Sequence, residues 1–164
     1  MSIRGLRGAL AGALCAVMMT VALPVEARDP DQANELFLVA QKAVDDGFYD
    51  VASRYVEQYL LKYPQGEQLV QAKLLLGQCY FFRSQYLKAY NVFQDLLSYK
   101  EFKDATLFWL GETYFKGADY LQAAKYYRQL LDDFPQSDFV PQAEYSLAWT
   151  FFEQGQYVVA QEAF

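Results

Sequence analysis

Apolar residues recur at helical spacing along most of the chain, in paired segments separated by short polar turns. The pair over residues 104–137 shows the pattern most clearly. It predicts a first helix with one apolar face, a turn at residues 116–119 and a second helix from about Tyr120. Pro135 ends that second helix, because proline cannot continue the helical hydrogen-bond ladder. The pattern therefore predicts an all-α chain built from helix–turn–helix units.

These units repeat. A small residue, a tyrosine nine places later and an alanine three places further on occur together four times. The four sets are Ala40, Tyr49, Ala52; Gly77, Tyr86, Ala89; Gly111, Tyr120, Ala123; and Ala148, Tyr157, Ala160. Such a period is the sequence signature of a stacked repeat array. The small residue has a physical role, because two helices cross closely only where one of them presents little side chain.

The repeat defines boundaries within the chain. The predicted units cover about residues 33–66, 70–103, 104–137 and 141–164, and the last is incomplete. The first and third units end at Pro64 and Pro135, whereas the second has Glu101 at the corresponding place. We therefore expect a less sharply defined boundary after the second unit.

One unit matches a known repeat pattern closely. An apolar and a small residue in the first helix, followed by aromatic, alanine, aromatic and proline positions, are matched by Leu110, Gly111, Tyr114, Ala123, Tyr127 and Pro135. Over about residues 33–164 the sequence resembles a tetratricopeptide repeat (TPR) array. The resemblance implies a right-handed superhelix of antiparallel helix pairs with a concave inner face. The usual tryptophan position of the first helix departs from the family pattern and holds Leu36, Lys73, Leu107 and Glu144.

The turns between units indicate which TPR proteins the sequence is most similar to. Residues 63–66 read Tyr-Pro-Gln-Gly and residues 134–137 read Phe-Pro-Gln-Ser. With an alanine-rich helix after them, they are most similar to exported bacterial TPR proteins. Such proteins include the coordinator of the Tol-Pal cell-division system and the outer-membrane assembly lipoprotein.

In TPR proteins one face of each first helix lines the inner groove, so the resemblance implies a binding surface here. Its residues lie at i, i+4 and i+7 on each first helix. They are Phe37, Gln41, Leu74, Gln78, Phe81, Phe108, Glu112, Phe115, Tyr145, Trp149 and Phe152, with Val44 completing the first row. Large rings with interspersed amides and a carboxylate suit a peptide anchored by bulky side chains. Packing between successive repeats is the alternative role for each of them.

The composition argues against several other classes of function. The 164 residues include no histidine and carry a net charge of −6. A histidine-based triad and the helical zinc-protease motif are therefore excluded, and a nucleic-acid partner held by phosphate contacts is not expected. Asp45-Asp46 and Asp132-Asp133 are interpreted as solvated helix ends. We predict no catalytic residue, no cofactor and no metal site, and hence a protein that is not an enzyme.

The first residues have a different character. Met1 to Ala27 has the pattern of a secretory signal peptide, with Arg4 and Arg7 before an apolar stretch that Pro24 ends. It predicts export to the bacterial periplasm, with outer-membrane association left open. An uncleaved signal that anchors the chain in the inner membrane is the alternative. Cys15 suits a lipoprotein signal less well, because bulky Leu14 precedes it.

These features predict a non-catalytic scaffold of the cell envelope that binds partner peptides or proteins. The alternatives are a permanent assembly subunit of an outer-membrane or secretion complex, and the helical module of a larger enzyme acting on envelope polysaccharides. Phe164 falls only four residues after Ala160, inside a predicted helix. Because repeat arrays normally end in a polar capping helix, we expect the chain to be part of a longer repeat protein. The partner's identity and the oligomeric state stay open.

Overall fold

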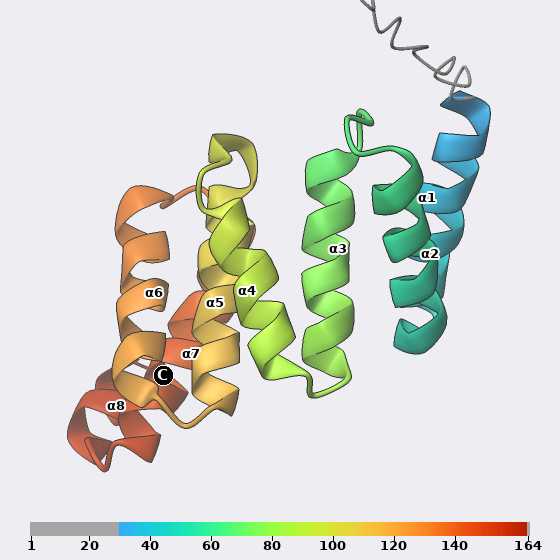
Figure 1. Cartoon of the computed structure of the whole chain (residues 1–164). Helices are drawn as coiled ribbons and strands as arrows, with labels where there is room; N and C mark the ends of the chain where they lie inside the picture. The colour runs from blue at the N-terminus through green and yellow to red at the C-terminus, as the bar shows by residue number, and fades with distance from the viewer. Residues whose placement is uncertain (1–29, 164) are drawn as a thin grey trace, which may run out of the picture.

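The computed structural model describes residues 30–163, and Figure 1 shows how their helices are arranged. The helices are α1 (Pro30–Asp45), α2 (Tyr49–Lys62), α3 (Leu69–Phe82), α4 (Tyr86–Leu96), α5 (Lys103–Lys116), α6 (Tyr120–Asp133), α7 (Val140–Glu153) and α8 (Tyr157–Ala163). A short 3-10 turn, η1 (Lys100–Phe102), precedes α5. No strand occurs in this part of the chain, so the predicted all-α fold is confirmed. The predicted signal peptide, residues 1–27, lies outside the described residues.

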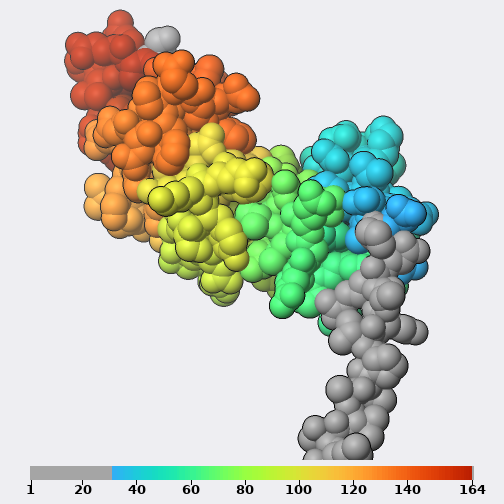
Figure 2. Space-filling view, turned by 90° about the horizontal axis from the view of Figure 1, so that it is seen from above, coloured from blue at the N-terminus to red at the C-terminus, as the bar shows by residue number. Residues whose placement is uncertain are grey.

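The helices form an extended stack. Each helix packs against the next along the chain, and α1, α3, α5 and α7 also contact one another in succession. α1 and α8 lie at opposite ends of the stack (Figure 1), and the space-filling view shows an elongated, bent body (Figure 2). This is the superhelical arrangement that the resemblance implies, in which each pair buries its apolar face against its neighbours.

The turn inside each helix pair has the same backbone geometry in all four pairs. A left-handed backbone conformation occurs at Gly47, Ser84, Ala118 and Gly155, with φ between 58° and 78°. The next helix then begins two residues later, at the tyrosine that the repeat predicts as its start. In the third pair, Asp119 caps the new helix, because its Oδ1 accepts a hydrogen bond from the Gln122 backbone N–H at 3.1 Å.

Close approach between paired helices depends on glycine. A Cβ atom on Gly77 would overlap the ring of Phe93, and one on Gly111 would overlap the ring of Tyr127. Both rings are fully buried. The predicted role of the small residue, to let two helices cross closely, is therefore confirmed at these two positions.

The boundary after the second pair differs from the other two. α2 and α6 each have 14 residues and end just before Tyr63-Pro64 and Phe134-Pro135, whereas α4 has 11 residues. The connection after α4 includes η1. The less sharply defined boundary predicted from Glu101 thus takes the form of a shorter helix followed by a 3-10 turn.

Cys79 lies in the interior of the stack. It is fully buried next to Ala43 and Ala52, and burial raises the pKa of its thiol to about 11. A protonated, enclosed thiol is a poor nucleophile. Cys79 therefore acts as a small apolar residue. None of the helices over residues 30–163 is both long and apolar enough to cross a membrane.

Candidate functional site

The predicted inner face lies on α1, α3, α5 and α7, and its residues differ in accessibility. Four are exposed: Gln41, Tyr145, Trp149 and Phe152. Five are half-buried: Phe37, Leu74, Gln78, Glu112 and Phe115. The remaining two, Phe81 and Phe108, are buried. The exposed rings of the predicted face therefore all lie on α7, toward the C-terminal end of the stack.

The two buried rings contribute to packing between repeats. The ring of Phe81 lies edge-on to Trp109 with 5.3 Å between centroids. The ring of Phe108 stacks on Phe139 at 5.0 Å and also contacts Tyr127. A side chain enclosed in this way offers no face to a ligand, so neither ring belongs to the accessible part of the predicted surface.

A pocket of about 360 Å³ opens between α5 and α7. It is lined by Glu112, Phe115, Tyr145, Ser146, Trp149 and Glu153. Four of these six residues belong to the predicted inner face. The structure thus brings together the C-terminal members of that face, whereas Phe37, Gln41, Leu74 and Gln78 lie farther along the stack.

Ring contacts hold the wall of this pocket in place. Trp149 lies edge-on to Tyr145 at 6.3 Å and to Phe152 at 5.4 Å. Phe152 continues the series to Tyr157 at 5.2 Å. Edge-to-face contacts of this kind favour defined ring orientations. Tyr145 is nevertheless 59% exposed and Trp149 38% exposed, so both rings remain accessible.

One carboxylate of the pocket is fixed by hydrogen bonds. Glu112 Oε1 accepts from the hydroxyl of Tyr127 and from the hydroxyl of Ser146, each at 2.7 Å. Burial, and then the negative charge of Glu112, raise the pKa of Tyr127. The phenol therefore stays protonated and continues to donate. This network joins α5, α6 and α7 directly beneath the pocket.

The second carboxylate is held more loosely. Glu153 Oε2 accepts a hydrogen bond from the Tyr120 hydroxyl at 3.4 Å, and its side chain is exposed. The ring of Tyr120 in turn lies edge-on to Phe115 at 5.5 Å. The pocket thus combines one fixed and one adjustable carboxylate with three rings.

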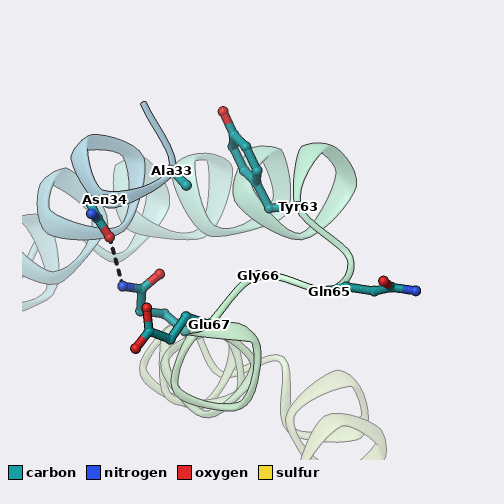
Figure 3. A pocket seen from close by; sticks show the side chains of 7 residues that line it. Ala33, Asn34, Tyr63, Gln65, Gly66 and Glu67 are labelled. Atoms are coloured by element: carbon teal, nitrogen blue, oxygen red, sulfur yellow. Dashed lines mark hydrogen bonds between the residues drawn. The ribbon is translucent and has the colours of Figure 1, made fainter. Parts of the chain in front are cut away.

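A second pocket, near α1, has a different character (Figure 3). It encloses about 220 Å³ between α1 and the loop that joins α2 to α3, and it is lined by Ala33, Asn34, Tyr63, Gln65, Gly66, Glu67 and Gln68. Gln68 Nε2 donates to Asn34 Oδ1 at 2.8 Å across it (Figure 3). This hydrogen bond engages the side-chain amides of Asn34 and Gln68, and the pocket contains none of the predicted site residues.

Comparison with known proteins identifies the architecture. The sequence profile of the tetratricopeptide repeat matches residues 105–137, which span α5 and α6. A tetratricopeptide repeat protein from Parabacteroides merdae superposes with a TM-score of 0.67 and 18% identity, over 81% of this chain and 51% of that protein. The fold is that of a TPR array.

Other TPR-like structures show the same architecture. The apo form of RapI has a TM-score of 0.74 and 16% identity, over 84% of this chain and 55% of its own. MamA from Desulfovibrio magneticus RS-1 has a TM-score of 0.70 and 17% identity, over 85% of this chain and 73% of its own. The TPR array thus spans about half the length of the Parabacteroides protein and of RapI. At these identities the likeness concerns the fold alone. No curated protein matches the chain in sequence.

Two residues of the TPR pocket were not predicted as site residues. Ser146 lies three residues before Trp149, and Glu153 lies four residues after it, so both share its side of α7. Adding the positions one residue after the first and last members of the row, i+1 and i+8, would have included them. No group of His, Cys, Asp or Glu residues within residues 30–163 is arranged to hold a metal ion.

Proposed function

We propose that this protein is a non-catalytic scaffold that binds a segment of a partner protein along the inner helices, with the α5–α7 pocket as its anchor. The observation that carries the proposal is the exposure of large, oriented rings around a defined hollow. Binding energy at protein interfaces concentrates at such residues, because a large rigid side chain excludes much water at little entropic cost.

The proposed setting is the bacterial envelope. The signal-peptide pattern of residues 1–27 supports export, and the mature chain would then act in the periplasm. We expect osmotic shock to release a periplasmic protein that has been cleaved after Ala27. Retention of the full-length chain in the inner membrane would instead favour the anchored alternative.

The binding proposal is tested by removing the rings. A peptide library displayed on phage is selected against the chain that begins at residue 28, and the selected peptides are titrated. Phe115→Ala combined with Trp149→Ala is expected to weaken binding at least tenfold, about 1.4 kcal/mol. The matched control is Leu87→Ala combined with Leu121→Ala, two side chains that are 75% and 74% exposed on α4 and α6.

The control pair removes two exposed apolar side chains outside the pocket, so it is expected to bind within twofold of the unchanged chain. Circular dichroism checks that both double variants keep their helical content. Equal binding by the folded pocket variant and the control would contradict the proposal.

A permanent assembly subunit is the second candidate. It is favoured by exposed apolar residues on α8, where Val158 is 72% and Tyr157 62% exposed next to the ring series of α7. Contiguous apolar surface of this kind marks protein contact sites. Light scattering distinguishes the two roles: a monomer that binds peptides reversibly supports the scaffold, and an obligate oligomer supports the subunit.

A further inference from the structure

The charge inside the α5–α7 pocket is of one sign. Glu112 on α5 and Glu153 on α7 bring two carboxylates to a hollow of about 360 Å³, and none of its six lining residues is basic. Each carboxylate can neutralise a cation that enters. A carboxylate ligand entering the same hollow would meet repulsion from both.

The rings of the pocket favour the same class of ligand. Phe115, Tyr145 and Trp149 line it together with the two carboxylates. The face of an aromatic ring is electron-rich and attracts a cation lying within about 6 Å of its centre, with tryptophan the strongest of the three. Carboxylates and ring faces therefore favour a group that is cationic and also flat or apolar in part.

Within residues 30–163, no lysine or arginine lines this pocket. Lys116 Nζ lies 5.9 Å from the ring centroid of Phe115, yet Lys116 does not line the pocket. Arg128 lies over the ring of Phe151, at 5.1 Å. These contacts show that cations approach rings in this part of the array, while the hollow itself is lined by residues that are acidic, aromatic or neutral.

We infer that the pocket binds the cationic side chain of an arginine in the partner segment, with lysine as a weaker substitute. This inference rests on the proposed scaffold function and specifies its partner's chemistry. A guanidinium group stacks flat on an aromatic ring while its edge donates two parallel hydrogen bonds to a carboxylate. An ammonium group is a more strongly hydrated point charge and cannot do both.

The glutamates have unequal roles in this arrangement. Glu112 Oε1 is engaged by Tyr127 and Ser146, so its position is set before a ligand arrives. Glu153 is exposed and has one long hydrogen bond to Tyr120, so it can turn toward a bound guanidinium. Replacing Glu153 therefore tests the inference without disturbing the hydrogen bonds beneath the pocket.

The experiment uses a capped tripeptide, acetyl-Ala-Arg-Ala-amide, and its citrulline counterpart, which has nearly the same shape without the charge. The chain contains two tryptophans, Trp109 and Trp149, so two indole N–H signals report binding by NMR. We expect the arginine peptide to shift the Trp149 signal saturably, with Trp109 unaffected. The citrulline peptide is expected to bind at least fivefold more weakly, and 0.5 M salt is expected to weaken arginine binding.

Matched charge variants locate the effect. Glu153→Gln is expected to weaken arginine binding by about three- to tenfold. Glu144→Gln removes the same charge from an exposed position on the same helix outside the pocket, and it is expected to leave binding within 1.5-fold. Equal binding of arginine and citrulline, or equal effects of the two variants, would overturn the inference.

The outcomes separate this inference from the proposed function. Library peptides that depend on Phe115 and Trp149 but carry no basic residue would leave the scaffold proposal standing and remove the arginine inference. The arginine peptide could instead bind at Trp149 while the library peptides bind the double alanine variant unchanged. That outcome would support the cation site and contradict the proposed role of the pocket as an anchor.

Discussion

Phe81 on α3 and Phe115 on α5 occupy the same position in successive repeats, four residues after Gly77 and Gly111. The next inner helix along the stack is α5 for Phe81 and α7 for Phe115, and these two helices carry side chains of very different size two residues before the small residue. Trp109 holds that position on α5, and Ser146 holds it on α7. Phe81 is 7% exposed beneath Trp109, whereas Phe115 is half-buried and lines the pocket with Ser146.

At the α3–α5 contact this position therefore holds a ring that packs on the preceding phenylalanine, whereas at the α5–α7 contact it holds a small side chain that lines the pocket. Trp109 also contacts Phe82, Phe93 and Phe108, with ring centroids 5.4–6.2 Å away, so it joins three helices. Ser146 contributes only a hydroxyl, which donates to Glu112. The same repeat thus supports stability at the α3–α5 contact and an accessible hollow at the α5–α7 contact.

The largest effect on stability is expected when the α3–α5 contact, which Trp109 fills, is made to resemble the open α5–α7 contact. Trp109→Ser should lower the free energy of unfolding by about 3–5 kcal/mol, because it removes a ring packed against four others and leaves a cavity. Urea denaturation followed by circular dichroism measures the change. Trp109→Leu, which introduces the residue found at the same position of α3 (Leu75), should have a smaller cost.

The matched control is the other tryptophan. Trp149→Ser removes a ring that is 38% exposed, and its cost should stay within about 1 kcal/mol. If the two serine variants lost equal stability, the assignment of Trp109 to packing and Trp149 to the surface would be wrong.

This contrast also shows how far the sequence alone leads. The starts of α2, α4, α6 and α8 follow from tyrosines at fixed spacing, and the close helix crossings follow from Gly77 and Gly111. Both are local properties of a unit: the tyrosine recurs in all four units, and glycine holds the small-residue position in two of them. Likewise, the i, i+4, i+7 row on α5 and α7 brought Phe115 and Trp149 to one surface.

The burial of Phe81 could not be predicted in the same way. It depends on the size of Trp109, a residue 28 positions later on a different helix, so the row on α3 alone cannot show it. Glu112 is similar, because its donors Tyr127 and Ser146 come from two other helices. Position within a repeat is therefore predictable, whereas accessibility depends on which side chain the next repeat supplies.

An intermediate effect is expected at the ring beneath the pocket. Tyr127 on α6 corresponds to Phe93 on α4, and only Tyr127 donates to a carboxylate. Tyr127→Phe should cost about 1.5–3 kcal/mol, the usual contribution of a hydrogen bond to a charged group. Urea denaturation at pH 8 measures this cost, and Phe93→Tyr, which adds a buried hydroxyl at the filled contact, serves as the converse variant.

The same substitution should alter the response to alkaline pH. The pKa of Tyr127 is raised in the folded state from its ordinary value of 10.0, so its phenol loses its proton in the unfolded chain first. Stability from this group is complete below pH 10 and falls above it, by about 1.4 kcal/mol per pH unit. Burial and Glu57 raise the pKa of Tyr80 to about 12, and this contribution is the same in the unchanged chain and in Tyr127→Phe. Tyr127→Phe should therefore lose stability less steeply between pH 10 and pH 11, and an unchanged slope would contradict the assignment.

The smallest effect on stability is expected when the open α5–α7 contact is made to resemble the filled α3–α5 contact. The same change should have the clearest effect on peptide binding. Ser146→Trp places an indole against Phe115 in the position that Trp109 occupies against Phe81. The hydroxyl that donates to Glu112 is lost, but apolar surface is gained, and Tyr127 still donates to the carboxylate. We expect the free energy of unfolding to change by less than about 1 kcal/mol relative to Ser146→Ala, which removes the hydroxyl alone. Ser146→Ala should keep peptide binding, and Ser146→Trp should abolish it. A filled pocket that still bound the selected peptides would show that the hollow between α5 and α7 is not where they bind.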